Sequence, residues 1–247
     1  MNDERHVEDA DAAPRLGPHL GPYRGSDSVE IESRVFLRPI ASPLALGFLA
    51  LGGATLLLSG LQLGWFPTSE TRYVAFAMMT FGAPLQLLAS VFGFLARDPV
   101  AATGMGVLAA TWLTVGLVKL SSAPTATSSV LGVFLVFAGA ALLVPASSAL
   151  FGKLVPAAVL LTAALRFFLT GLFELSANQG LHYAAGIVGL VLLAVALYAA
   201  LALQLEDVRR KTVLPVLRVG AGRAAVEGAP ADQLEGVEHE AGVREQL

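Results

Sequence analysis

Residues 181–205, LHYAAGIVGLVLLAVALYAALALQL, form a run of 25 residues without a single Asp, Glu, Lys or Arg. An α-helix rises ~1.5 Å per residue and the hydrocarbon layer of a bilayer is ~30 Å thick, so about 20 apolar residues suffice to cross it. Backbone polar groups in lipid must be paired within their own segment, which a helix achieves. This stretch therefore predicts a membrane-spanning helix and decides the fold class.

Five further stretches of similar length and composition precede it. They are 43–63, 72–96, 101–121, 128–148 and 154–175, separated by short segments that contain Pro, Gly or charged residues. We therefore expect an all-α, polytopic membrane protein with six transmembrane helices in residues 42–205. The Pro-, Gly- and charge-rich residues 1–41 predict a disordered N-terminal tail, and residues 206–247 a mostly disordered C-terminal tail.

The distribution of charge supports the same fold class. The chain has 247 residues, of which 55% are hydrophobic and 14% charged, whereas about 25% charged is usual for a soluble domain. Only 8 of its 35 Asp, Glu, Lys and Arg residues lie in 43–205, too few to cover a soluble surface. The net charge of −3 leaves no basic surface of the kind that nucleic-acid binding requires.

Signatures of enzymes and bound cofactors are missing from the sequence. With no cysteine, the chain has no disulfides, iron–sulfur clusters or thiolate metal sites, and its four histidines lack the spacing of metal ligands. The motifs of zinc proteases, serine hydrolases and phosphate-binding loops do not occur. We expect no catalytic residues, no metal and no cofactor.

Six spans place both termini on one side of the membrane, and positive charges indicate which side. The termini and even-numbered loops hold seven Lys and Arg residues near span ends: Arg34, Arg38, Arg97, Lys153, Arg209, Arg210 and Lys211. The odd-numbered loops hold two, Arg72 and Lys119. Positive charges concentrate on the cytoplasmic side. We therefore expect both tails in the cytoplasm and a multi-pass protein of the plasma membrane.

Small residues recur at four-residue spacing within the spans, for example Gly60 with Gly64 and Ala185 with Gly189. Such rows allow helix backbones to approach closely in lipid. They predict tight packing within the helix bundle or between protomers of an oligomer.

The fifth span carries a polar row in which Thr162, Arg166, Thr170 and Glu174 follow each other at four-residue spacing. At 100° per residue these side chains form one slanting stripe, which should face protein or water. An Arg near the middle of a span costs at least ~2.5 kcal/mol to insert, so it requires a partner or an aqueous cavity. Two interpretations remain open. Arg166 attracts an anion on a solute pathway, or it only fixes helix packing by binding backbone carbonyls or Glu174.

Two other polar side chains are candidates for the pathway. A buried amide such as Gln86 has donors and acceptors that its own helix cannot satisfy, which favours a role between helices or in a pore. Thr111, in the third span, is weaker evidence, because a Thr hydroxyl commonly bonds to the carbonyl four residues earlier in its own helix.

Several motifs resemble those of one family of membrane proteins. Ser42-Pro43-Leu44-Ala45-Leu46-Gly47-Phe48 stands where this family has an Asn-Pro-Ala-Pro-Leu-Gly-Leu signature, with Pro43, Leu46 and Gly47 retained. Phe81-Gly82 with Gln86, Trp112-Leu113-Thr114, and the closing Thr212-Val213-Leu214-Pro215 match in the same order. On these residues the chain resembles the acetate uptake transporter family, the succinate–acetate permeases of bacteria and their fungal relatives.

The resemblance implies a six-helix protomer that forms a homohexamer. Each protomer would hold its own narrow, proton-linked path for acetate and similar monocarboxylates, or succinate. In the family this path narrows at a Phe, a Tyr and a Leu, whose positions fall here at Leu51, Leu108 and Ala163. Arg166 and Glu174 stand where the family usually has uncharged residues.

The leading hypothesis is thus a permease or channel for small organic acids. In this hypothesis the narrow zone of the pathway is formed by Leu51, Leu108 and Ala163, and hydrogen bonds are offered by Gln86, Thr111 and Thr162. Arg166 attracts the anion. Glu174 would tune Arg166 or take up the proton. The alternatives are a channel for a neutral solute, such as ammonia or an undissociated acid, and a transport-dead membrane scaffold whose tails recruit partners.

Overall fold

The computed structural model describes residues 41–220, 222 and 223. The chain divides into two units, Met1–Arg38 and Pro39–Leu247, and the described residues belong to the second. The predicted tail up to residue 40, including Arg34 and Arg38, and the end of the chain after residue 223 lie outside the described residues.

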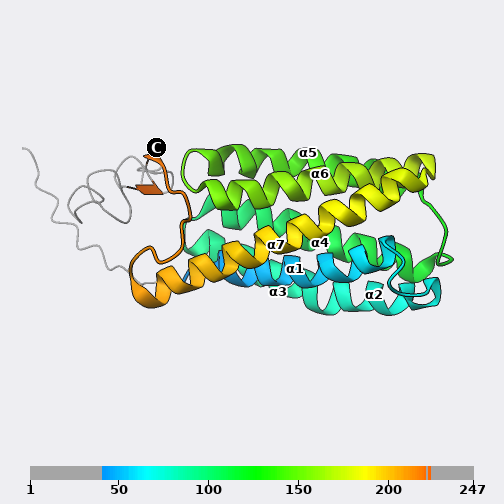
Figure 1. The fold of residues 1–247 in the computed structure, drawn as a ribbon, viewed down its shortest axis with the longest axis horizontal. Coiled ribbons are helices and arrows are strands. Elements are labelled where there is room, and N and C mark those ends of the chain that lie inside the picture. Colours follow the sequence, from blue (N-terminus) through cyan, green and yellow to red (C-terminus); the bar gives the residue numbers. More distant parts are fainter. Residues whose placement is uncertain (1–40, 221, 224–247) are drawn as a thin grey trace, which may run out of the picture. The chain divides into compact units, whose positions relative to one another are not determined.

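The described chain is built from helices, and six of its helical segments are long and apolar enough to cross a membrane (Figure 1). The elements are α1 (Pro43–Gln62), η1 (Thr68–Glu70), α2 (Thr71–Ala77), η2 (Met78–Gly82), α3 (Ala83–Leu95), α4 (Pro99–Ser121), α5 (Ser129–Leu150), α6 (Leu154–Ser176) and α7 (Gln179–Arg209). Residues Thr68–Leu95 act as one span. The all-α class and the six predicted spans are confirmed.

Local sequence signals explain where several helices begin. Asp98, Ser128 and Asn178 precede α4, α5 and α7, and each side chain accepts a bond from a backbone N–H of the first turn. These caps satisfy N–H groups that have no partner within the helix. Pro43 and Pro99 occupy first positions of α1 and α4, where a missing N–H costs nothing.

The second span is interrupted by the five-residue π-helical turn η2. The turn ends at Gly82, two residues before Pro84, which lies in the first turn of α3. A proline ring clashes with the carbonyl four residues earlier in a regular α-helix and removes one hydrogen bond. The wider turn accommodates Pro84, which explains why one predicted helix becomes three consecutive helical elements.

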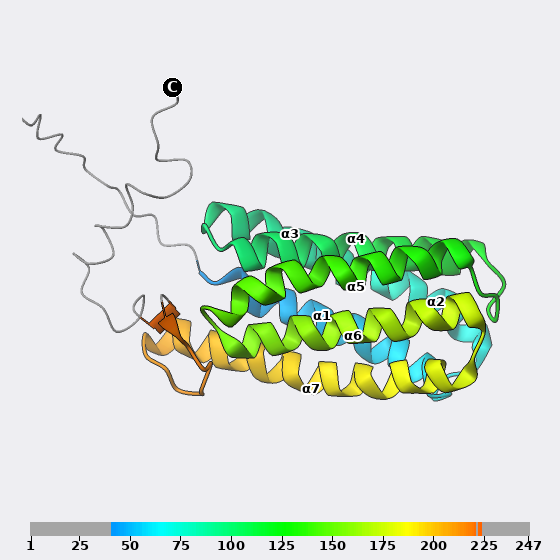
Figure 2. The same cartoon turned by 90° about the horizontal axis from the view of Figure 1, so that it is seen from above.

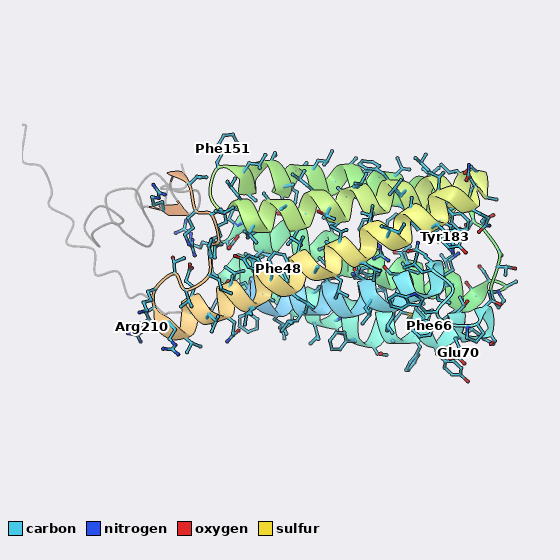
Figure 3. All side chains as sticks on the ribbon, viewed as in Figure 1. Phe48, Phe66, Glu70, Phe151, Tyr183 and Arg210 are labelled. Atoms are coloured by element: carbon cyan, nitrogen blue, oxygen red, sulfur yellow. The ribbon has the colours of Figure 1, made fainter. Side chains whose placement is uncertain are left out.

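The bundle has two ends. The terminal end holds the beginning of α1, the turns α3–α4 and α5–α6, and the end of α7, where Figure 3 labels Phe151 and Arg210. The distal end holds the connections α1–α2, α4–α5 and α6–α7, near the labelled Phe66, Glu70 and Tyr183. Helix α1 packs on α7 and α3, and α6 packs on α5 and α7 (Figure 2). Helix α7 therefore packs on both α1 and α6.

Glycines permit the closest approach between α5 and α6. A Cβ on Gly171 would lie 2.8 Å from the carbonyl oxygen of Gly132, and one on Gly132 would lie 2.9 Å from that of Gly171. Backbone contact of this kind supplies packing energy that burial cannot provide in lipid. Neither glycine belongs to the four-residue rows identified in the sequence, so this contact is a finding of the structure.

The beginning of the predicted C-terminal tail is structured. Helix α7 continues beyond residue 205 to Arg209, and residues 212–219, which we call the C-terminal strap, pack on the terminal end. Val216 is 1% exposed, and Tyr198 donates to the carbonyl of Pro215 at 2.9 Å. Arg218 pairs with Glu206. The strap contains the Thr212–Pro215 motif, so this motif has a structural role in the fold.

Candidate substrate pathway

Arg166 lies in the middle of α6 and is 1% exposed. Its guanidinium reaches across to α1. Nη1 donates to Thr55 Oγ1 at 3.1 Å, and Nη2 lies within 3.3–3.4 Å of Thr55 O, Ser59 Oγ and Gln62 Oε1. Residues 55, 59 and 62 share one face of α1 because they are spaced by about one helical turn each. All four acceptors are uncharged oxygen atoms.

Two further residues shape the space around Arg166. The guanidinium carbon lies 5.7 Å from the ring centroid of Trp112 on α4, a distance at which a cation is attracted to the ring face. On the α7 side, Gly189 leaves room for the side chain, since a Cβ there would lie 2.8 Å from Arg166 Nε and 2.0 Å from Ser59 Oγ. The small-residue position Gly189 therefore makes space for a side chain.

Glu174 does not contact Arg166, contrary to one of the two expectations from the sequence. Its Oε1 pairs with Lys119 Nζ of α4 at 2.6 Å, and its Oε2 accepts from the Ser128 N–H at 2.8 Å. The polar row of α6 slants around the helix, so Arg166 and Glu174 meet different neighbours. Arg166 does bind a backbone carbonyl, that of Thr55, and this bond is compatible with both interpretations of Arg166.

A cavity of about 190 Å³ lies at the distal end. Lys119, Glu174 and His182 line it together with Gln62 and Thr170. Gln62 accepts from Arg166 and its Nε2 lies 3.4 Å from Thr170 Oγ1, while Thr170 donates to the carbonyl of Arg166. The cavity lining and the partners of Arg166 thus share Gln62, so the cavity ends next to the buried arginine.

The three residues expected to form a narrow zone are buried. Leu51 on α1, Leu108 on α4 and Ala163 on α6 are each 0% exposed and belong to one hydrophobic core. Ala163 lies one turn before Arg166 on α6. Burial is the property that an apolar constriction needs, because dry side chains limit the leak of polar solutes.

Gln86 connects α3 to α1, which is the inter-helix role predicted for it. The side chain is 0% exposed, and Nε2 donates to the carbonyl of Gly47 at 3.3 Å. Its Oε1 has no partner, and the same is true of two donors, Trp112 Nε1 and Arg166 Nε. Buried polar atoms are normally satisfied, so each of these three atoms lacks a bond that such atoms usually make.

The other residues of the signature at the start of α1 position the helix. Pro43 and Gly47 are buried and Leu46 is half-buried. The backbone N–H of Ser42 donates to Asp207 Oδ2 at 2.9 Å, which joins the beginning of α1 to the last turns of α7.

The threonine hydroxyls behave as the local interpretation predicts. Thr111 Oγ1 donates to Val107 O and Thr162 Oγ1 to Ala158 O, each at 2.7 Å and each four residues earlier. Their protons are therefore used by their own helices. Only the oxygen lone pairs remain to accept a bond from a solute or neighbour.

Sequence reasoning missed the polar face of α1 and the role of Lys119. Thr55, Ser59 and Gln62 recur at helical spacing in the first span, and this periodicity is the signal that could have identified them. From the sequence, Lys119 is expected only to contribute to the charge pattern that sets topology. Its burial against Glu174 depends on how α4 and α6 are rotated, which hydropathy does not encode.

The structure thus has six candidate spans, a cavity at one end that includes Lys119, Glu174 and His182 in its lining, and a buried arginine bound to neutral oxygens. These features define a polytopic membrane protein. Residues 27–219 match the GPR1/FUN34/yaaH family, and the chain belongs to this family. It is a family of acetate transporters and channels, not of enzymes. The resemblance to acetate uptake transporters is confirmed.

A solved structure described as that of the bacterial acetate channel SatP is similar to this chain. The two share 26% sequence identity with a TM-score of 0.64, and the match covers 72% of this chain and 99% of the channel. The search of curated proteins found no match.

Proposed function

We propose that the protein conducts small monocarboxylates, acetate first among them, across the plasma membrane through a path within each protomer. One observation carries the proposal: a fully buried Arg166 whose four hydrogen-bond acceptors are all uncharged. A buried cation is costly unless an opposite charge compensates it. Within the described residues no carboxylate forms an ion pair with Arg166. The carboxylate of a substrate would supply the compensating negative charge.

The arrangement of the remaining groups fits this role. A carboxylate entering the distal cavity would reach Gln62, next to Arg166. The unpartnered donors Arg166 Nε and Trp112 Nε1 would favour an anion there, and Gln86 Oε1 would accept from a hydroxyl or water. Leu51, Leu108 and Ala163 would form the narrow part, with the oxygens of Thr111 and Thr162 as weak polar contacts.

The finer features of the proposal rest on the family and on the charge pattern. Similarity to an acetate channel supports a short organic acid as the substrate. The excess of Lys and Arg near the termini and even-numbered loops favours a cytoplasmic location for both tails. Assembly as a homohexamer and coupling to protons are the behaviour that the family resemblance implies.

The test is uptake of radiolabelled acetate into vesicles containing the purified protein. Arg166→Ala should lower uptake about ten- to hundredfold, because a hydrogen bond to a charged group contributes about 1.5–3 kcal/mol. The matched control is Arg72→Ala, which removes an exposed arginine of α2 and should leave uptake unchanged. Equal rates for Arg166→Ala and the wild type would remove Arg166 from the mechanism.

A second arm separates an anion pathway from one for a neutral solute. At a fixed total concentration of acetate and with no proton gradient, acetate exchange should be competed by propionate and lactate. As the pH falls, it should reach a plateau instead of rising in proportion to the undissociated acid. Competition by ammonia, or strict dependence on undissociated acid, would favour the neutral channel. No flux of acetate, propionate, lactate or succinate in the wild type would exclude the proposed function.

A further inference from the structure

A second set of charges lies in the distal cavity, apart from Arg166. The Glu174 side chain is 1% exposed and that of Lys119 14% exposed, with 2.6 Å between Oε1 and Nζ. An isolated ion pair removed from water gains little net stability, because desolvation offsets the attraction. This pair lines the cavity, so the attraction between its two charges does not by itself account for its position.

Both partners of the pair are fully engaged. Glu174 accepts from Lys119 and from the backbone N–H of Ser128, and Lys119 also donates to the carbonyl of Ala126 at 3.2 Å. The pair thus fastens the α4–α5 connection to α6. While Glu174 is ionised, it neutralises the ammonium group that faces the cavity, so an incoming anion meets no net positive charge from this pair.

We propose that Lys119 is a second carboxylate-binding site of the pathway and that Glu174 controls it by taking up a proton. In the first state, the Glu174 carboxylate is ion-paired with the Lys119 ammonium group. When Glu174 gains a proton from the distal side, its attraction for the ammonium falls, and the carboxylate of the substrate binds Lys119 in its place. One proton and one monocarboxylate enter together, and the net charge of the cavity is unchanged.

The other groups around Glu174 are consistent with this exchange. Among the described residues that line the cavity, Lys119 from α4 and His182 from α7 are the titratable groups besides Glu174. Residues 122–128 of the α4–α5 connection carry no charged side chain. The His182 ring is held on Phe173 with its centroid 4.3 Å away, and its Nδ1 is buried without a partner. His182 can therefore donate to a bound carboxylate beside Lys119.

The cavity is large enough for a short carboxylic acid. A volume of about 190 Å³ compares with ~30 Å³ for one water molecule in the liquid. The cavity therefore accepts a short carboxylic acid with a few waters. Its inner residues Gln62 and Thr170 then pass the carboxylate on to Arg166, so Lys119 and Arg166 act as successive sites on one path.

The experiment compares two kinds of transport in the same vesicles, and it rests on the proposed function. Wild-type protein should accumulate acetate when the distal side is acidic, and its acetate exchange should rise as the pH falls. Glu174→Gln keeps one of the two acceptor oxygens, for Lys119 or for the Ser128 N–H, and cannot ionise. We expect it to lose the acid-driven accumulation at least tenfold and to exchange acetate at a rate that no longer depends on pH.

The matched control is Glu70→Gln, which removes a carboxylate of η1 that does not line the cavity and should behave as the wild type. Wild-type pH dependence in Glu174→Gln would overturn the proposal while leaving carboxylate transport intact. An absence of all flux in the wild type would instead overturn the proposed function.

A second experiment measures acetate binding and proton uptake by the purified protein, so that poor folding of a variant is not mistaken for loss of transport. In weakly buffered detergent solution, adding acetate to the purified wild type should remove about one proton from solution per acetate bound, followed with an indicator dye. Lys119→Met should bind acetate at least tenfold more weakly and take up no proton at this site. Proton uptake in Lys119→Met equal to that of the wild type would also overturn the proposal.

Discussion

At the scale of single residues, Arg166 illustrates how a bundle accommodates a charge that lipid would reject. The side chain makes its hydrogen bonds on one face of α1, lies by the ring of Trp112 and occupies the space left by Gly189. Four different helices therefore determine its position. A charge held this rigidly is preorganised to bind an anion without first rearranging its surroundings.

This arrangement predicts a strong effect of Gly189→Ala. The added Cβ would approach Ser59 Oγ to 2.0 Å and Arg166 Nε to 2.8 Å, so Arg166 must move off α1. Overpacking of this kind costs about 1–3 kcal/mol. We expect a lower melting temperature in detergent and a loss of acetate uptake of about tenfold or more, measured on the same preparation.

The control for this change is Gly152→Ala. Gly152 lies in the α5–α6 turn, and a Cβ there meets no atom within 4 Å. Both uptake and melting temperature should stay at the wild-type values. A Gly189→Ala protein that transports normally would show that the contact between Arg166 and α1 is not needed for transport.

At the scale of elements, hydropathy predicted the existence and order of the spans well. The fifth predicted span, 154–175, corresponds to Leu154–Ser176, and the first, 43–63, to Pro43–Gln62. The last helix extends beyond residue 205 to Arg209 because hydropathy marks where lipid ends, whereas helical hydrogen bonds continue into water. The π turn before Pro84 was not predicted, since apolar composition carries no information on local helix geometry.

The candidate site was predictable only in part, for a related reason. The row on α6 identified Arg166 and Thr170, since four-residue spacing defines a face without knowledge of its neighbours. Which helix that face meets depends on rotation and packing. The bonds from Arg166 to Ser59 and from Lys119 to Glu174 cross between helices that are far apart in sequence, and they could be found only in the structure.

The C-terminal strap, residues 212–219, carries a prediction at this scale. The first free N–H groups of α6, those of Leu154 and Val155, donate to the carbonyls of Leu217 and Val216, and Arg218 pairs with Glu206. Ending the chain after Lys211 removes these partners and exposes the bundle surface that Val216 covers. We expect a clearly lower melting temperature and reduced transport.

Ending the chain after Arg223 is the matched comparison, because it keeps the whole strap. This shorter truncation should leave acetate uptake and melting temperature unchanged. Since a scaffold would depend on its tails, loss of function after the shorter truncation would favour the scaffold interpretation over a transporter. Equal behaviour of the two truncations would show that the strap does not stabilise the bundle.

At the scale of the whole bundle, the charged residues of the spans are sorted by position. Asp98 pairs with Lys153 at 3.3 Å where the α3–α4 and α5–α6 turns meet, and Lys119 with Glu174 near the distal end. Arg166 is the described charge that lies in the middle of a span. The positive charges at the terminal end are those from which the orientation is predicted. Arg166 in the middle and Lys119 at the distal cavity are the charges proposed to bind a solute.

The orientation itself gives the last prediction, which the absence of cysteine from the chain makes simple to test. Ser69→Cys introduces an exposed thiol in η1 at the distal end, and Phe151→Cys replaces a side chain that is 78% exposed at the terminal end (Figure 3). Because Arg97, Lys153 and Arg209 gather at the terminal end, the positive-inside tendency places that end in the cytoplasm. A membrane-impermeant maleimide should label Ser69→Cys on intact cells and Phe151→Cys only after permeabilisation, with the cysteine-free wild type as the blank. The reverse labelling pattern would show that the protein has the opposite orientation, with the Lys119 cavity on the cytoplasmic side. Protons and carboxylates would then enter the cavity from within the cell.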